Sequence, residues 1–548
     1  MFTSGKLSPH RWCAAGMVAC LLVLAACGGS GGGVAGGDAG GLPDGDGPPP
    51  AEPVVELTVR PEAIKELVLS WTGVPPEATV TVQEDLDGQS GFASRLILPA
   101  GRTTARLPVF LPSRLGALYR LRICLGTDCR ESEPVGLSED LTAAAGYFKP
   151  ESNATAAFFG ASVAFSSSGT TMAVGALGAG KVEVFVLEGS AWRSEAVLSA
   201  PEGVPGRWGA SVALSRDGNR LAVGAPGEQE AGQVVVLSRS NGVWAVSATL
   251  SGGESTSDGY GSAVALSAEG DYLAVGAPRT RRGQASVGAA YLYFDGPVPW
   301  YEVGRVMPSD LTSGAEFGAS VALSAQGTAL LVGEPGAHAG IGAARVYRVG
   351  AGTLNEEVEL TGSQDQGPRR FGHSVAWAQG GGAVDRVAVG APCSQRLFSP
   401  FCTGAVHVLS RPIGGEWAQE VELQAAVPRD KDRFGYSVSI SGDGAVLAVG
   451  TPGDAGSASG IGLSSGEPSL TASGAVHVFR RGAVQWLLPA VLKAPNVDRL
   501  DEFGLAVALS ANGQALAVGS PGEASAASGI GGAMDDNSLQ EHGAVYLY

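Results

Sequence analysis

The chain has 548 residues, enough for two or more domains. Its 83 glycines and low content of charged residues (16%) are typical of a turn-dense all-β protein and exclude a mainly helical one. The formal net charge of -17 repels phosphate backbones, so we expect no nucleic-acid partner. The simplest role of this negative charge is to keep the protein soluble outside the cell.

Residues 1–26 have the parts of a secretory signal peptide: Lys6 and Arg11, followed by an apolar core that is too short to span a bilayer. The tetrapeptide LAAC, which ends at Cys27, resembles the lipobox of bacterial lipoproteins. The resemblance implies that Cys27 becomes the first mature residue and carries a diacylglycerol and usually an N-acyl chain. More than one acyl chain makes membrane attachment stable. The alternative is a plain signal peptide with an incidental cysteine.

Residues 27–52 are rich in Gly and Pro and cannot bury a core, so they predict a flexible tether. Gly28 follows Cys27, whereas an Asp there would resemble an inner-membrane retention signal. We therefore expect an outer-membrane lipoprotein, on either the cell surface or the periplasmic side. No later stretch has 18 uninterrupted apolar residues, so the lipid is the expected membrane anchor.

Four of the seven cysteines remain when the signal peptide and Cys27 are set aside. Cys124 and Cys129 flank a four-residue turn, and Cys393 and Cys402 flank a longer loop. An exported protein meets an oxidising compartment, so two disulfides are expected, Cys124–Cys129 and Cys393–Cys402. A zinc site is the weaker alternative, because the two pairs are far apart and lack a nearby His.

Residues 53–136 contain five or more short strand-like runs, which predict a small β-sandwich. One run (LVLSW) ends at Trp71, and an alternating run (YRLRIC) begins at Tyr119. Their order resembles a fibronectin type III or other immunoglobulin-like module. Tyr119 is expected to have a structural role, either in the core or in a corner hydrogen bond.

The rest of the chain is built from a repeat. Each copy has an aromatic-Gly step, a run such as SVALS, a tight turn, and a second run such as LAVGAP. Spacings of 49 to 69 residues with this content indicate a propeller or array. The aromatic residues of the steps are Phe159, Trp208, Tyr260, Phe317, Phe371, Phe434 and Phe503.

FGASVAL at Phe317, LAVGAP at Leu221 and GAVHVF at Gly474 resemble the FG-GAP family, the repeats of integrin α-subunit propellers. The resemblance covers residues 141–548 and implies a seven-bladed β-propeller of four-stranded blades, preceded by the small β-sandwich. A run that starts near an aromatic and ends on an apolar residue six positions later predicts the fourth strand. The aromatic at its start, usually Trp, is expected to wedge between blades.

The seventh repeat ends at Tyr548 without a fourth strand. Residues 141–150 supply a candidate, because Phe148 precedes Phe159 by 11 residues, as Leu492 precedes Phe503. We therefore expect this segment to pair with the last strand of the chain and close the ring, which removes exposed pairing edges.

Integrin-like repeats often carry an Asp-rich calcium loop, but the corresponding turns here have at most two acids, so we expect no metal and no other cofactor. The exception to weigh is Asp535-Asp536-Asn537, either a weak ion site or a solvated loop. HExxH, GxSxG and GxxxxGKS motifs are absent. The sequence therefore favours a protein that is not an enzyme and has no catalytic residues.

The loop between the second and third strands has 22-residue forms in the last two repeats, Pro452 to Gly474 and Pro521 to Gly543. Structureless loops this long usually carry function, although duplication without function is an equal alternative. The candidate binding residues in these loops are Asp454, Ile461, Glu467, Glu523, Ile530, Asp535 and Asp536.

Three functions remain open. The leading one is a monomeric cell-surface module that binds a protein or glycan, as in adhesion. The second is a periplasmic scaffold for outer-membrane assembly. The third is a propeller hydrolase acting on glycans or lipids, which rests on analogy of fold alone.

Overall fold

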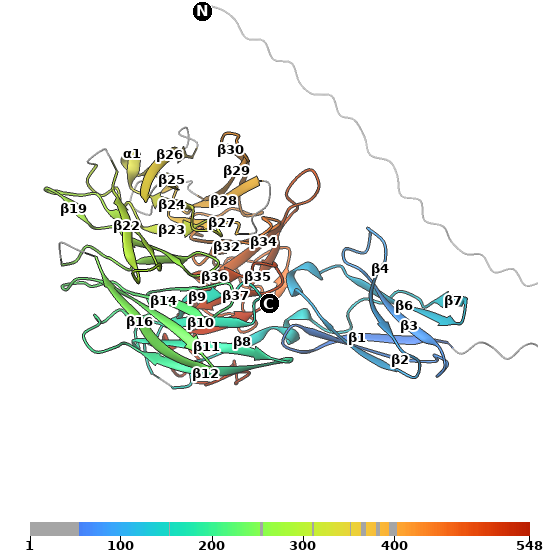
Figure 1. Ribbon diagram of the computed structural model, residues 1–548. Helices are drawn as coiled ribbons and strands as arrows, with labels where there is room; N and C mark the ends of the chain where they lie inside the picture. The colour runs from blue at the N-terminus through green and yellow to red at the C-terminus, as the bar shows by residue number, and fades with distance from the viewer. Residues whose placement is uncertain are drawn as a thin grey trace, which may run out of the picture. The chain divides into compact units, whose positions relative to one another are not determined.

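The computed structural model describes residues 54–152, 154–252, 256–308, 312–350, 352–362, 369–379, 384–393 and 403–548. The expected signal peptide, the lipid-bearing Cys27 and the tether lie outside these residues, as does Cys402. The described chain is all-β (Figure 1). Within it, no helix has the length and apolar character needed to cross a membrane.

The N-terminal module consists of a three-stranded sheet, in the order β1-β2-β5, and a four-stranded sheet, in the order β4-β3-β6-β7. Trp71 is buried, and its indole N–H donates to the Arg102 carbonyl at 3.0 Å. Tyr119 is also buried and donates its hydroxyl to Glu84 at 2.9 Å, which gives it the structural role expected of it. The strands are β1 (Glu56–Ala63), β2 (Glu66–Thr72), β3 (Thr79–Asp85), β4 (Ala93–Leu98), β5 (Thr104–Pro108), β6 (Leu118–Leu125) and β7 (Asp128–Glu131), with single 3-10 turns η1 (Leu111–Ser113) and η2 (Leu141–Ala144).

The remaining strands form successive antiparallel sheets, numbered here from the first to the seventh in chain order. The first four contain β9 (Phe159–Phe165), β10 (Thr171–Ala176), β11 (Lys181–Glu188) and β12 (Ala191–Ser199); β13 (Ser211–Leu214), β14 (Arg220–Ala225), β15 (Gln233–Ser240) and β16 (Val243–Ser251); β17 (Ala263–Leu266), β18 (Tyr272–Ala277), β21 (Ala289–Phe294) and β22 (Tyr301–Val306); and β23 (Ser320–Leu323), β24 (Ala329–Glu334), β25 (Ala343–Gly350) and β26 (Thr353–Thr361). A hairpin of β19 (Arg281–Arg282) and β20 (Ala285–Ser286) and the short α1 (Ala337–Gly340) lie in loops of the third and fourth sheets.

The last three sheets follow the same order. They contain β27 (Ser374–Trp377), β28 (Val384–Ala391), β29 (Ala405–Pro412) and β30 (Ala418–Leu423); β31 (Ser437–Ile440), β32 (Val446–Thr451), β34 (Ala475–Arg480) and β35 (Ala490–Leu492), with β33 (Ile461–Gly462) added at the outer edge; and β36 (Ala506–Leu509), β37 (Leu516–Ser520), β38 (Ala544–Leu547) and β8 (Gly146–Phe148).

The first strands of the sheets form a closed cycle. Each of β9, β13, β17, β23, β27 and β31 contacts the first strand of the next sheet, and β36 contacts β9 again. Figure 1 shows β9, β27 and β36 toward the middle of these sheets, with β12 and β16 at their outer margin. This arrangement of four-stranded sheets is a β-propeller.

The aromatic-Gly step forms a tight turn at or just before the start of each first strand. In the sixth sheet the N–H of Tyr436 donates to the carbonyl of Arg433, and Gly435 lies between them with φ of 88°. This is the position of a type II turn that requires positive φ, and a Cβ there would lie 2.6 Å from the Ala405 carbonyl oxygen. Phe434 before it is fully buried and packs in the core. The repeat therefore needs Gly for the turn and an aromatic for the core.

A serine three residues after the aromatic joins most neighbouring sheets. Ser437 Oγ donates to the carbonyl of Gly504 in the next sheet at 2.9 Å. The third and seventh sheets have Ala263 and Ala506 at this position. The other serines donate in the same way to the next sheet, namely Ser162, Ser211, Ser320 and Ser374.

The last sheet takes its fourth strand from the N-terminal side of the propeller. β8 is antiparallel to β38, with Phe148 opposite Val545 and Tyr147 opposite Tyr546. Phe148 is fully buried and contacts Trp192 of the first sheet, with ring centroids 5.8 Å apart. Strands from the two ends of the propeller thus pair in one sheet. Without β8, the outer edge of β38 would be left unpaired.

A β-bulge in the fourth strand turns a glutamate toward the neighbouring sheet. In the first sheet, Glu195 is skipped between two paired residues of β12. Its carboxylate accepts hydrogen bonds from Arg239 and, at 3.2 Å, from the Trp244 indole, both in the second sheet. Glu357 and Glu420 repeat this contact with the Trp of the next sheet. A bulge re-aims its side chain, and the expectation that these tryptophans lie between sheets is confirmed.

Candidate binding site

The first long loop is attached to its own sheet by a buried acid. Asp454 lies two residues after Pro452 and is 3% exposed. Its carboxylate accepts hydrogen bonds from Lys493 Nζ at 3.0 Å and from the N–H of Gly456 at 2.8 Å. Lys493 directly follows the fourth strand and is also buried. The side chain of Asp454 therefore holds the loop in place and does not face solvent.

The second long loop repeats this arrangement. Glu523, two residues after Pro521, forms an ion pair with Lys149, which directly follows β8. The hydroxyl of Tyr147 donates to the same carboxylate at 3.0 Å, and Asn496 donates to it at 3.1 Å. Glu523 is as well buried as Asp454. Two of the predicted binding residues thus form equivalent buried ion pairs in neighbouring sheets.

A second buried carboxyl lies beside each ion pair. Burial and the nearby Asp454 carboxylate raise the pKa of Asp432 to about 7. Burial also raises the pKa of Asp501 to about 7, with a further contribution from Glu523. Both residues stand two positions before the aromatic of the repeat. Each sheet therefore places two carboxyl groups and one ammonium group in an interior where charge is costly.

The Gly-Ile-Gly motifs of the long loops cover the outer edges of their sheets. Ile461 is in β33 and lies opposite Leu492 of the fourth strand. Ile530 forms an antiparallel bridge with Phe148, the equivalent strand of the seventh sheet. Both isoleucines are partly buried against apolar clusters. The recurring motif therefore protects a strand edge, which explains its occurrence in both loops.

The remaining predicted residues of the long loops, Glu467, Asp535 and Asp536, are exposed. The Asp536 carboxylate accepts hydrogen bonds from the N–H groups of Ser538, at 2.9 Å, and Ala526, at 3.3 Å. No group of three acids, histidines or cysteines suited to a metal ion occurs in the described ranges. The structure thus does not bring the seven predicted residues together into one site.

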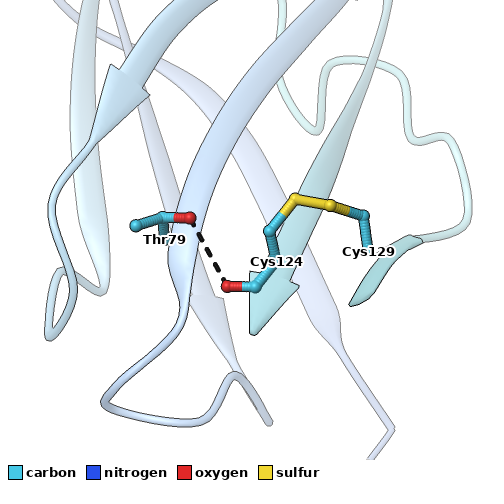
Figure 2. Close-up of a disulfide and its surroundings, with 3 residues drawn as sticks. All are labelled: Thr79, Cys124 and Cys129. Carbon is cyan, nitrogen blue, oxygen red and sulfur yellow. Dashed lines mark hydrogen bonds between the residues drawn. A yellow bond between two sulfur atoms is a disulfide. The ribbon is translucent and has the colours of Figure 1, made fainter. Parts of the chain in front are cut away.

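The N-terminal module contains a disulfide between Cys124 and Cys129, which joins β6 to β7 (Figure 2). The Cys124 carbonyl also accepts a hydrogen bond from Thr79 of β3 at 3.4 Å. Cys393 accepts a hydrogen bond from the N–H of Gly404, while Cys402 is outside the described residues.

An axial cavity of about 240 Å³ is bordered by the first strands and their turns. Apolar side chains such as Phe165, Leu266 and Ile440 border it together with Ser167, Ser439 and Gln379. Gln379 reaches the carbonyls of Leu266 and Leu323, at 3.4 and 3.2 Å, from the fifth sheet. Among the described residues that border this cavity there is no acid, histidine or lysine, so it offers packing surface and no proton-transfer group.

Four side chains that the sequence prediction omitted gather at the turns before the first strands of the fifth and sixth sheets. We call Arg370, His373, Arg433 and Tyr436 the rim cluster. The turn places its first and fourth residues side by side, because the N–H of His373 donates to Arg370 and that of Tyr436 to Arg433. The Arg433 guanidinium carbon is 4.6 Å from the centroid of the Tyr436 ring, a cation-π contact.

The rim cluster also joins the two sheets. The His373 and Tyr436 rings are 4.6 Å apart, and His373 Nδ1 lies 3.2 Å from the Tyr436 carbonyl oxygen. Since a carbonyl only accepts, Nδ1 carries the proton and Nε2 is left as an acceptor. Glu316 pairs with Arg370, and Glu502 pairs with Arg433 at 3.4 Å. Both arginine side chains remain partly exposed, at 27% for Arg370 and 23% for Arg433.

Burial and the two arginines lower the pKa of His373 to about 4, with the larger effect from burial. Its imidazole is therefore neutral at neutral pH. The rim cluster combines arginine N–H donors, one neutral imidazole acceptor and a phenol at two neighbouring turns. Such a set of groups suits recognition of a polar ligand.

Comparison with known proteins gives one family. Residues 248–293 and 417–479 match the model of the FG-GAP repeat. These two segments are FG-GAP repeats. No curated protein matches the chain.

Solved structures show only a distant likeness. Kuenenia stuttgartiensis hydrazine synthase has 13% identity and a TM-score of 0.44 over 67% of this chain and 93% of that one. U3-55K has 11% identity and a TM-score of 0.44, over 73% and 98% of the two chains. The C-terminal WD40 domain of Sif2 has 14% identity and a TM-score of 0.41, over 73% and 99%. At these values the likeness carries nothing about partners or chemistry.

The second FG-GAP segment contains Arg433 and Tyr436. A signal for the rim cluster exists in the sequence once the repeats are compared at the turn. The position two residues after the aromatic is Ala161, Ala210 and Ala319 in three sheets, Ser262 and Leu505 in two others, and His373 and Tyr436 in two neighbouring ones. The fold tolerates alanine there, so the turn itself does not require a large polar ring.

Proposed function

We propose that the chain is a cell-envelope lipoprotein whose propeller is a binding module, as in adhesion, for a protein or glycan partner. The observation that carries the proposal is the rim cluster. Two adjacent turns of the repeat carry half-buried His373 and Tyr436 where three other sheets have alanine, each beside a partly exposed arginine. An FG-GAP β-propeller is itself suggestive of an interaction module.

In this proposal the propeller has seven four-stranded blades, one for each of the successive sheets. The N-terminal module is a sandwich of the fibronectin type III or immunoglobulin-like kind, which spaces the propeller from the tether. Cys27 carries the lipid, and the protein is held at the outer membrane. The lipobox-like LAAC sequence and the Gly-rich residues after it support the anchor.

Site-specific photo-crosslinking on living cells tests the binding function. A photoreactive amino acid replaces Tyr436 in one strain and Ala210, the same turn position in the second sheet, in another. We expect a discrete adduct from position 436 that an excess of purified full-length protein suppresses. Equal adduct patterns from the two positions would contradict a binding site at the rim cluster.

The anchor is tested separately by growth with an alkyne-bearing palmitate and comparison of the wild type with Cys27→Ala. We expect label only in the wild type. Equal labelling of the two proteins would contradict acylation at Cys27.

A further inference from the structure

The rim cluster has three chemical properties that together restrict its ligand. Arg370 and Arg433 each use one Nη2 group in their ion pairs, with Glu316 and Glu502. A guanidinium has five N–H donors in one plane, so most N–H donors of each arginine remain available after the ion pair has formed. In the described residues, no other side-chain partner of either guanidinium is seen apart from the face of Tyr436. The two positively charged guanidinium groups therefore keep N–H donors that a ligand can use.

The second property is an acceptor beside these donors. His373 donates from Nδ1 to the Tyr436 carbonyl, so its Nε2 lone pair can accept from a donor on the ligand; the described part of the chain shows no donor to it. The third property is the aromatic pair itself, because the planes of the His373 and Tyr436 rings meet at 46° and bring two aromatic groups together across two sheets. A matching ligand carries an anionic group, a neighbouring hydrogen-bond donor and a partly apolar body.

We propose that the rim cluster binds the carboxylate of an acidic sugar, such as a uronic acid within a glycan. The carboxylate lies between Arg370 and Arg433, and a ring hydroxyl donates to His373 Nε2. This inference rests on the proposed binding function and names its ligand. A sugar acid places hydroxyl donors next to its carboxylate, whereas the carboxylate of an Asp or Glu side chain has no adjacent donor.

The charge of the protein fits one localised acid better than a dense polyanion. The chain as a whole carries a formal charge of -17, which repels extended polyanions. Within the cluster, the described residues pair each arginine with one glutamate, Glu316 or Glu502, so the charges balance, and the imidazole is neutral. A single incoming carboxylate competes with these two glutamates for arginine N–H groups. It meets less repulsion than an extended polyanion, which would also lie against other acidic parts of the surface.

The test uses calorimetric titration of the full-length protein in detergent. Trigalacturonate is the probe, with its methyl ester and galactotriose as uncharged controls and a hexaglutamate peptide as a carboxylate from a polypeptide. We expect binding of trigalacturonate alone.

The double variant His373→Ala/Tyr436→Ala restores the alanine of other repeats and should keep its fold. The second double variant is Arg370→Gln/Arg433→Gln. Each of the two double variants should weaken trigalacturonate binding about tenfold or more, the effect of losing one charge-assisted hydrogen bond.

Arg207→Gln is the matched control, because Arg207 occupies the same turn position in the second sheet, beside Ala210. It should leave trigalacturonate binding unchanged. The proposal is overturned if trigalacturonate does not bind, if the methyl ester binds equally, or if the variants of the rim cluster bind as the wild type does. Stronger binding of hexaglutamate would assign the site to a protein instead. A persistent photo-adduct from position 436 in any of these cases would leave the broader binding function standing.

Discussion

Lys149 and Glu523 form an ion pair in the interior of the last sheet, although 374 residues separate them in the chain. Neither side chain is more than 1% exposed. Lys149 follows the strand that completes this sheet, and Glu523 begins its long loop. The pair therefore holds together two segments, the closing strand and the long loop, that lie 374 residues apart in the chain.

The first prediction is that Lys149→Met destabilises the protein and loosens the closing strand. An uncompensated carboxylate in the interior costs about 3–5 kcal/mol, so urea unfolding should shift by that order. The double variant Lys149→Met/Glu523→Leu should recover part of the loss, because it removes both charges. Lys493→Met is the matched control, since it breaks the equivalent pair in the sixth sheet. Hydrogen exchange at residues 545–548 should rise in Lys149→Met more than in the control; equal rates would contradict a closing role.

The second prediction concerns pH. Burial raises the pKa of Asp501 to about 7, whereas an Asp in an unfolded chain titrates near 3.9. The folded state thus holds this proton more tightly, so its stabilising contribution is full below about pH 4 and is lost as pH rises through 7. Asp501→Asn should remove the contribution of this group, lessen the fall in unfolding free energy between pH 5 and 8, and raise Tm at pH 8 by a few degrees.

Thermal unfolding at several pH values measures this effect. Asp535→Asn, an exposed carboxyl of the same loop region, serves as control and should keep the wild-type slope. Burial raises the pKa of Asp432 and of Glu183 to about 7 as well, so part of the pH dependence should persist in Asp501→Asn, and adding Asp432→Asn should reduce it further. Identical profiles for Asp501→Asn and the wild type would refute the assignment.

The sequence predicts the repeat and its strands well because each strand depends on local pattern and on a turn. The 11-residue spacing from Phe148 to Phe159 predicts a strand next to the chain's last one, and Phe148 lies opposite Val545. The even spacing from Trp244 to Leu250 likewise predicts a fourth strand, which the structure has in β16. These features follow from side-chain alternation within a few residues.

The roles of single loop residues are harder to predict because their partners are distant. Nothing near Asp454 in the sequence indicates Lys493, which is 39 residues away, and an acid in a long loop is ordinarily solvated. The rim cluster has the opposite difficulty. Its members lie in an ordinary turn, and they become notable only when His373 and Tyr436 are compared with alanine in other repeats. The contact between these two rings depends on how neighbouring sheets meet.

The third prediction is that the serine between sheets is a transferable stabilising contact. Ser437→Ala should lower the free energy of unfolding by about 1 kcal/mol, because the Gly504 carbonyl loses one hydrogen bond. Ala506→Ser introduces the same group between the last sheet and the first and should raise stability by a similar amount. Ala263→Ser tests the position in the third sheet. Urea unfolding checks all three, and a destabilised Ala506→Ser would show that the contact does not transfer.

The fourth prediction separates the parts of the second long loop that support the fold from those that are free. Ile530 bridges Phe148 and packs partly buried against the cluster between the last sheet and the first, so Ile530→Ala should cost about 1–2 kcal/mol. Asp535 lies in the same loop but is exposed, so Asp535→Ala should change stability by less than about 0.5 kcal/mol. Urea unfolding compares them, and proteolysis of the native proteins should cut the loop faster only in Ile530→Ala. If both variants lost stability equally, the loop would be held by its whole length and not by the Gly-Ile-Gly edge. If neither did, the pairing of Ile530 with Phe148 would contribute nothing to the closed ring.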